Sequence, residues 1–366
     1  MKLFNPNILQ SIFTFLFLQN YKPTYLIFFS TNKCEAKCKH CFYWKQTNNN
    51  ISELSIIEIE ELARNLGPMI QITVTGGSPE LRDDLYDILY AFIKHCSPVN
   101  ITLCSNGNYP EILYRTAKKA LSNFKNLHLT IDISLDGLNE KHDSIRGLNG
   151  LFSNVIHSYS LLKELKKEYP NLRLGCGLVV SGLNSDTAME TAKWAINNLP
   201  IDNFTPVLVR GEPREKEALI VLPDVFKNIS DDVEKLLIKG ELKGYSNFTK
   251  INNSKDIIQK QLIYKIYKEK KSFIRCSALR ETAVVYPDGT VGCCELRSES
   301  VGNLRNHNMD LKHLWESSKA KTLRKLIKVN NCYCWHQCFL SASIVKDHRM
   351  WMNLTKTFIK GKNDRK

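Results

Sequence analysis

Three cysteines near the start of the chain have a spacing that suits an iron–sulfur cluster. Cys34, Cys38 and Cys41 form a C-x3-C-x2-C array directly after the apolar run 25–29, which predicts a buried strand. Three thiolates this close together can hold a cluster and leave one iron without a protein ligand, open to a reacting molecule. Zinc is the alternative metal, although a structural zinc normally takes four protein ligands and the nearest further donor is His40.

Turns at the ends of later predicted strands supply further candidate residues. Paired glycines let the backbone approach a ligand closely, and a following proline makes the turn rigid. An Asn-Gly pair taken alone is as typical of an ordinary turn as of a turn that binds a ligand. The three turns read Thr75-Gly76-Gly77-Ser78-Pro79-Glu80, Cys104-Ser105-Asn106-Gly107, and Ser134-Leu135-Asp136-Gly137 with the downstream segment His142-Asp143-Ser144-Ile145-Arg146-Gly147.

The cysteine array and these turns together resemble the motifs of radical S-adenosylmethionine (radical SAM) enzymes. In that family the open iron binds the amino and carboxylate groups of the methionine moiety of SAM. The resemblance implies that the backbone of Gly76 and Gly77 holds the methionine ammonium and that Asn106 lies near the cofactor. It also implies that Ser134 and Arg146 contact the carboxylate, for which a hydroxyl and a permanently charged guanidinium are suited.

Two positions depart from the family pattern. Ser78 stands where the family usually has Glu, and His40 stands where it usually has an aromatic residue that borders the adenine. Because the backbone does most of the holding at the glycine turn, we expect SAM binding to survive the change at Ser78. We expect Asp136 to order its loop or to face the substrate. His142 and Asp143 suggest either an acid/base pair or, as we favour, a structural role in fixing the loop of Arg146.

Alternating strands and helices must position these residues. The predicted strands cover residues 25–30, 70–75, 100–104, 127–134, 173–180 and 203–209, and segments such as 55–63 between them have helical periodicity. This alternation predicts an α/β fold, which the resemblance narrows to a partial (β/α)6 TIM-like barrel followed by a small C-terminal α+β domain. Chemistry in such folds collects at the carboxyl ends of the strands. Arg210, after the sixth strand, either reaches the active site or closes the barrel through a salt bridge.

A second group of cysteines lies near the end of the chain. It consists of Cys276, Cys293-Cys294 and the array Cys332-x-Cys334-x3-Cys338. The turn 286–289 contains Asp-Gly and predicts a hairpin that brings Cys294 next to Cys276. The pattern resembles SPASM and twitch domains, which hold auxiliary [4Fe–4S] clusters.

Five or six cysteines are too few for a two-cluster SPASM domain, so the resemblance implies one cluster in a twitch-like domain. Its preferred ligands are Cys276, Cys294, Cys334 and Cys338, with Cys332 as a substitute and Cys293 as an unliganded neighbour. A structural zinc at the same thiolates is the alternative. The other three cysteines, Cys96, Cys104 and Cys176, lie in apolar contexts and are predicted to be small buried hydrophobic residues.

The predicted organisation has five segments. They are an apolar extension (1–22), a radical SAM core (23–210), a helical connector (211–275), an auxiliary-cluster domain (276–345) and a basic tail (346–366). The apolar stretch 8–18 is shorter than the roughly 20 residues that span a membrane. We favour a helix or strand packed on the core, with a membrane-surface helix and an export signal as the alternatives.

Composition limits the classes of function. A chain of 366 residues with 43% hydrophobic residues can bury a large core, and its length suits two domains. Twelve cysteines without a convincing secretory signal favour metal ligation in a reducing compartment, and hence the cytoplasm. The net charge of +14 comes from dispersed residues without an aromatic-interleaved basic stripe, so we do not expect nucleic-acid binding.

The resemblance implies an oxidoreductase or maturase-type enzyme. Its [4Fe–4S] cluster would cleave SAM reductively to a 5′-deoxyadenosyl radical, which abstracts hydrogen from a peptide, protein or small-molecule substrate. The electrons would come from a donor such as flavodoxin or ferredoxin, and no side chain beyond the cluster ligands is assigned a catalytic role. An iron–sulfur electron carrier or redox sensor is one alternative, although it needs neither Ser134 nor Arg146. A zinc-containing nucleic-acid-binding protein, with salt-dependent affinity, is the other.

Overall fold

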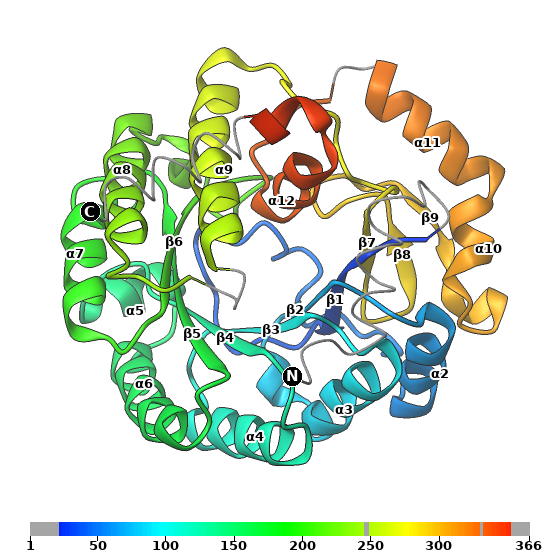
Figure 1. The fold of residues 1–366 in the computed structure, drawn as a ribbon, viewed down its shortest axis with the longest axis horizontal. Helices are drawn as coiled ribbons and strands as arrows, with labels where there is room; N and C mark the ends of the chain where they lie inside the picture. The colour runs from blue at the N-terminus through cyan, green and yellow to red at the C-terminus, as the bar shows by residue number, and fades with distance from the viewer. Residues whose placement is uncertain (1–21, 245–248, 330–331, 353–366) are drawn as a thin grey trace.

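A single nine-stranded sheet, with helices along its outer side, organises the protein (Figure 1). The structure is a computed structural model that describes residues 22–244, 249–329 and 332–352. The strand order is β6-β5-β4-β3-β2-β1-β7-β8-β9, in which β1 to β6 are parallel. These six strands are β1 (Tyr25–Thr31), β2 (Gln71–Gly76), β3 (Asn100–Ser105), β4 (Leu129–Ser134), β5 (Leu172–Val180) and β6 (Asn203–Leu208).

The six strands confirm the sequence prediction, with ends that differ from it by one or two residues. The helices that alternate with them along the chain are α2 (Ile56–Leu66), α3 (Leu85–Cys96), α4 (Pro110–Asn123), α5 (Glu140–Arg146), α6 (Leu151–Glu168) and α7 (Ala188–Asn198), with the short 3-10 helix η1 (Pro79–Leu81) after β2. The mixed α/β architecture of a partial barrel followed by a smaller region is therefore the one that the sequence predicts.

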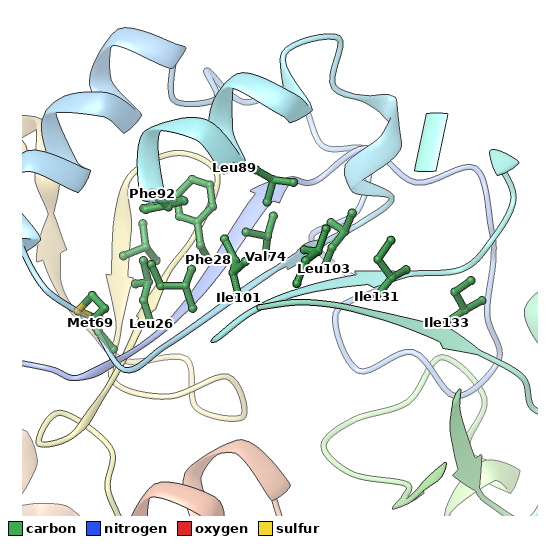
Figure 2. Packing of buried hydrophobic residues seen from close by; sticks show 14 of the residues in the cluster. Leu26, Phe28, Met69, Val74, Leu89, Phe92, Ile101, Leu103, Ile131 and Ile133 are labelled. Atoms are coloured by element: carbon green, nitrogen blue, oxygen red, sulfur yellow. The ribbon is translucent and has the colours of Figure 1, made fainter. Parts of the chain in front are cut away.

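Strand β1 buries both of its faces, as strands of a parallel sheet do. Leu26 and Phe28 point outward into the main core, where Phe28 meets Phe92 of α3 edge to face with ring centroids 5.1 Å apart (Figure 2). The alternate residues Ile27 and Phe29 belong to a second apolar cluster on the other face. Alternation along a strand thus anchors the outer helices with one set of side chains and fills the inner side of the sheet with the other.

Helix α2 begins where the sequence predicts, and its first turn explains why. The Ser55 side chain accepts a hydrogen bond from the Glu58 backbone N–H, and the Glu58 carboxylate accepts one from the Ser55 N–H at 2.8 Å. This capping box satisfies donors that the first helical turn would otherwise leave unpaired.

The C-terminal region continues the sheet of the barrel. The predicted hairpin is present as β7 (Thr282–Val285) and β8 (Thr290–Gly292), and β9 (Ser300–Asn303) follows in antiparallel pairing. Strand β7 pairs in parallel with β1 from Tyr25↔Thr282 to Phe28↔Val285. The sequence predicts a small domain here without indicating that it shares the sheet of the barrel.

The remaining helices lie after β6 and beside the hairpin. They are η2 (Lys216–Leu219), α8 (Pro223–Lys239), α9 (Thr249–Glu269), η3 (Leu304–His307), α10 (Leu311–Glu316), α11 (Ser318–Val329) and α12 (Gln337–Lys346). The chain around the start of α12 reaches β6, because Trp335 Nε1 donates to the Val209 carbonyl at 2.9 Å and Gln337 Nε2 donates to the Pro206 carbonyl at 2.6 Å. The C-terminal region therefore contacts both β1 and β6, the two end strands of the barrel.

Two predictions concern residues outside the described ranges. The apolar stretch 8–18 is one, and residues 353–366 of the basic tail are the other. Among the described residues, none of the helices combines the length and the hydropathy that a membrane span requires.

Candidate active site

The carboxyl ends of the barrel strands surround a cavity of about 230 Å³. A more open hollow of about 470 Å³ lies beside the first cysteine loop, between 32–33 and 48–53, and none of the predicted site residues lines it. All eight residues that the sequence predicts for cluster and SAM binding line the 230 Å³ cavity: Cys34, Cys38, Cys41, Gly76, Gly77, Asn106, Ser134 and Arg146.

Hydrogen bonds to its backbone hold the first cysteine loop in place. The Asn48 side chain accepts from the Cys34 N–H at 3.0 Å and donates to the Cys34 carbonyl at 2.8 Å. On the far side of the loop, the Lys39 N–H donates to the Ile145 carbonyl at 2.9 Å. Burial raises the pKa of all three thiols, to about 12 for Cys38, so ionised sulfur at this site needs a nearby positive group such as a metal.

The glycine turn packs directly on this loop. The Gly77 N–H donates to the Thr31 carbonyl and the Ser78 N–H donates to the Lys33 carbonyl, each at 2.8 Å. A Cβ atom on Gly76 would lie 2.4 Å from the Thr31 carbonyl oxygen, and one on Gly77 would lie 2.0 Å from the Lys33 carbonyl oxygen. The glycines therefore allow close approach of two backbones, which places the turn against the cysteine loop.

The side chain of Asn106 connects three strand ends. Its Nδ2 donates to Glu35 Oε1 at 2.9 Å and to Ser78 Oγ at 3.0 Å, and Ser78 Oγ lies 3.5 Å from Cys34 Sγ. Asn106 thus lines the cavity, but its amide nitrogen is engaged by protein groups. Its contribution to the site is to align the cysteine loop with the glycine turn.

A buried ion pair holds the predicted carboxylate-binding arginine. Arg146 Nε donates to Asp136 Oδ2 at 2.5 Å, and Arg146 Nη1 lies 3.9 Å from Cys38 Sγ. Burial opposes ionisation of the Asp136 carboxyl, but the charge of Arg146 keeps its pKa below the usual value. Asp136 Oδ1 also accepts from the Val179 N–H at 2.7 Å. Asp136 therefore orders its loop, which was one of its two predicted roles, and fixes Arg146 toward the cysteines.

His142 and Asp143 serve the architecture of the same loop. His142 Nδ1 accepts from the Asp136 N–H at 3.1 Å, and burial lowers the pKa of His142 to about 4, which makes the ring neutral. The Asp143 carboxylate accepts from the N–H groups of Gly150 and Phe152, at 2.6 and 2.8 Å, at the start of α6. The structural role favoured from the sequence is the one that these contacts support.

A cluster of charged residues lies between the cavity and the C-terminal cysteines. Arg210 lines the cavity, stacks on Phe42 with its guanidinium 5.0 Å from the ring centroid, and has Nη2 3.6 Å from Glu295 Oε2. Glu295 is hydrogen-bonded to the buried His336. The sequence left open whether Arg210 reaches the active site or forms a salt bridge. In the structure it lines the cavity and also forms a salt bridge, to Glu295. Sequence reasoning missed Glu295 and His336, for which the available signal was their position beside predicted cysteine ligands.

Four C-terminal thiols influence one another electrostatically. Cys294, Cys332 and Cys334 all act on Cys276, and Cys294 and Cys332 act on Cys334. Cys338 is influenced by other groups, namely Glu295, Arg210, Tyr25 and Asp132. Cys332 is thus electrostatically coupled to the predicted ligands Cys276 and Cys334, while Cys338 packs with Cys276 and Cys294 against a shared apolar cluster.

The remaining cysteines divide into two kinds. Cys96 and Cys176 are fully buried, as predicted, whereas Cys104 lines the cavity. Among the residues that the structure describes, no three His, Cys, Asp or Glu side chains gather tightly enough to form the coordination shell of one metal ion. The first three cysteines instead line a shared cavity together with a permanently cationic arginine. That donor set fits a cluster with an open iron and a ligand that carries a carboxylate.

Comparison with known protein families identifies two domains. Residues 28–195 match the radical SAM superfamily. This part of the chain is therefore a radical SAM domain. Residues 276–339 match SPASM, an iron–sulfur cluster-binding domain, which is one of the two related domain types that the sequence resembles. Radical SAM proteins of this kind are enzymes, and the cofactors of this one are SAM and [4Fe–4S] clusters.

The proteins that resemble this radical SAM enzyme have names that refer to different functions. A Pyrococcus horikoshii protein named "Probable GTP 3',8-cyclase" is 26% identical over 309 residues, which is 81% of this chain and 92% of that protein. Two solved structures have a TM-score of 0.58. "Native anSMEcpe with bound AdoMet" is 18% identical and the match covers 94% of this chain and 98% of that one. "Crystal structure of Streptococcus suis SuiB bound to precursor peptide SuiA" is 14% identical and the match covers 90% and 74%. At these identities the two structures show a shared fold.

Proposed function

We propose that this enzyme cleaves SAM reductively at a [4Fe–4S] cluster held by Cys34, Cys38 and Cys41, and abstracts a hydrogen atom from a peptide or small-molecule substrate. A donor such as flavodoxin or ferredoxin supplies the electron. The observation that carries the proposal is that the three cysteines share one cavity of about 230 Å³ with Gly76, Gly77, Ser134 and Arg146.

When bound, the cluster and SAM would supply the hydrogen-abstracting chemistry, and the residues around the cavity would hold both groups in place. Arg146 binds the SAM carboxylate, together with the Ser134 hydroxyl, because its guanidinium is permanently charged and already oriented by Asp136. The backbone of Gly76 and Gly77 receives the SAM ammonium. Apolar residues at the ends of β5 and β6, Val179, Val207, Leu208 and Val209, complete the wall and exclude water from the reacting atoms.

We propose Cys276, Cys294, Cys332 and Cys334 as the ligands of an auxiliary [4Fe–4S] cluster. The mutual electrostatic influence of these thiols supports the set, and Cys338, which packs with Cys276 and Cys294 against one apolar cluster, is the alternative ligand. A cluster there would supply an electron acceptor close to the cavity, with Arg210 and Glu295 between the two sites. Net oxidation of the substrate is the reaction that this arrangement suits.

Two substrate classes fit the proposal. The name of the Pyrococcus horikoshii relative refers to the nucleotide GTP, and the SuiB structure contains a precursor peptide. A net charge of +14 would attract nucleotides and acidic peptides alike by long-range steering. We therefore propose an anionic organic substrate of either class.

Anaerobic reconstitution tests the proposed function. The purified chain, loaded with iron and sulfide, should release 5′-deoxyadenosine when dithionite and SAM are added. The triple variant Cys34→Ala, Cys38→Ala, Cys41→Ala should release none, yet keep the iron of the C-terminal site. Cys96→Ala is the matched control, because it removes a buried thiol that does not line the cavity. Absence of 5′-deoxyadenosine from the loaded wild-type enzyme, with and without nucleotide or peptide candidates, would contradict the proposal.

A further inference from the structure

Ser78 lies beside a sulfur of the SAM-binding cluster and is fully buried. Its Oγ is 3.5 Å from Cys34 Sγ and 3.0 Å from Asn106 Nδ2. A hydroxyl has one proton to donate, so which neighbour receives that proton decides what Ser78 does at the site.

The chemistry of the neighbours decides the direction of both hydrogen bonds. Asn106 Oδ1 accepts from the Asn108 N–H at 2.9 Å, which fixes the amide so that Nδ2 faces Ser78 and Glu35. An amide nitrogen only donates, so Ser78 Oγ accepts from Asn106. A cysteine that binds iron is a thiolate and only accepts. The single proton of Ser78 is therefore directed at Cys34 Sγ.

We infer that Ser78 donates an O–H···S hydrogen bond to the Cys34 sulfur and thereby raises the reduction potential of the SAM-binding cluster. The inference rests on the proposed function, in which Cys34 is a cluster ligand. Hydrogen bonds to the sulfurs are among the factors that set such potentials, because a donated proton stabilises the additional electron density of the reduced cluster. The residue that usually occupies this position in the family, Glu, carries no such proton when it is ionised.

Acidic side chains near Ser78 make its hydrogen bond relevant to the reduction potential of the cluster. Glu35 acts electrostatically on Cys34, and Glu80 is buried next to Glu35. Burial raises the pKa of the Glu80 carboxyl to about 7, while the Ser105 hydroxyl opposes that rise. The negative charge of Glu35 on this side of the cluster disfavours the addition of an electron. The hydroxyl dipole of Ser78 acts in the opposite direction at the nearest sulfur.

The test is a redox titration followed by electron paramagnetic resonance. The signal to follow is the one that the triple variant at Cys34, Cys38 and Cys41 lacks, which separates it from the auxiliary cluster. Ser78→Ala should move its midpoint to a more negative potential, by roughly a tenfold change in the equilibrium constant for reduction, which is about 59 mV for one electron. Ser230→Ala is the matched control. Ser230 is also buried with one hydroxyl bond, to the Phe226 carbonyl at 2.7 Å, but lies on α8.

A second readout identifies the proton itself. After exchange into D2O, pulsed resonance of the reduced cluster should show a deuteron coupling that is absent from Ser78→Ala and present in Ser230→Ala. Asn106→Asp should lose the same coupling with Ser78 intact, because the new carboxylate accepts the Ser78 proton and draws it from the sulfur. This variant also covers the case in which Ser78→Ala fails to hold iron.

The possible outcomes are distinguishable. If the triple variant shows the same resonance signals as the wild type, the proposed function fails. If that signal is lost as expected but the midpoint and the deuteron coupling of Ser78→Ala match those of the wild type, the inference about Ser78 fails and the proposed function stands. A shifted midpoint with the coupling retained in both Ser78→Ala and Asn106→Asp would also overturn the inference, because the shift would then have another cause.

Discussion

Single side chains decide the chemistry of both cysteine groups. In the proposed SAM site, Asp136 holds Arg146 in one orientation and leaves its Nη1 near Cys38. At the other group, Cys332 and Cys338 are both near predicted ligands in the sequence. They differ in their electrostatic neighbours, since Cys332 acts on Cys276 and Cys334 whereas Cys338 is influenced by Glu295 and by Tyr25 of β1.

Variants of Cys332 and Cys338 form a matched pair for a measurement of iron content. Cys332→Ala should lower the iron of the reconstituted enzyme by about four atoms per chain, because it removes a ligand of one [4Fe–4S] cluster. Cys338→Ala should keep the full amount. Iron and sulfide analysis with ultraviolet–visible spectra measures both. The reverse pattern, with iron lost from Cys338→Ala alone, would return Cys338 to the ligand set.

At the scale of elements, the turn after β2 and the loop after β1 behave as one unit. Their backbones are joined by hydrogen bonds from the Gly77 and Ser78 N–H groups to the carbonyls of Thr31 and Lys33. The sequence indicated that the glycines allow close approach to a ligand. The structure shows that they first allow close approach to the cysteine loop, so the shape of the cluster site depends on the absence of two side chains.

Gly77→Ala tests this dependence. The new Cβ would lie 2.0 Å from the Lys33 carbonyl oxygen, a backbone atom that can move only if the cysteine loop moves. We expect a loss of stability of about 2–3 kcal/mol, measured by chemical denaturation, and loss of iron from the SAM-binding site. Gly177→Ala is the control, because a Cβ there would make only ordinary contacts, at 3.9 Å or more, with Asp132. Wild-type iron content and stability in Gly77→Ala would refute the claim.

Over the whole molecule, the C-terminal region is attached to the barrel by more than the pairing of β7 with β1. Arg305 in η3 donates from Nε to Glu58 Oε1 at 2.6 Å, and its two terminal nitrogens donate to the carbonyls of Ser52 and Glu53 at 2.9 and 3.0 Å. One guanidinium thus joins the last part of the chain to the segment before α2. The Glu58 that it contacts is the same residue that caps α2.

Arg305→Ala should loosen this attachment. We expect hydrogen exchange at the amides of β8 and β9 to become roughly tenfold faster, because the local opening free energy falls by about 1–2 kcal/mol. The matched control is Arg64→Ala, whose ion pairs with Glu60 and Glu61 lie within α2. Mass spectrometry of exchanged peptides measures the difference. Equal exchange at β8 and β9 in the two variants would show that Arg305 does not hold the region.

The sequence predicts much of this molecule because much of it is local. The six barrel strands follow from apolar runs, and the β7–β8 hairpin follows from the Asp288-Gly289 turn. The pairing of β7 with β1 could not be predicted, since a four-residue strand carries no signal that selects a distant partner. The same holds for Glu295, His336 and Ser78, whose importance comes from neighbours far away in the chain. Spacing also could not separate Cys332 from Cys338, because it does not show where side chains at the start of α12 point.

The pairing of β7 with β1 also has a consequence for how the protein is made. Strand β2 follows β1 closely in the chain, whereas β7, the strand that covers the other edge of β1, is synthesised only after all six barrel strands and helices α8 and α9. Until then, the edge of β1 presents unpaired backbone groups flanked by apolar side chains such as Leu26 and Phe28. Open apolar edges pair readily with other chains. The growing chain therefore carries this open apolar edge until the C-terminal region that contains β7 has been synthesised.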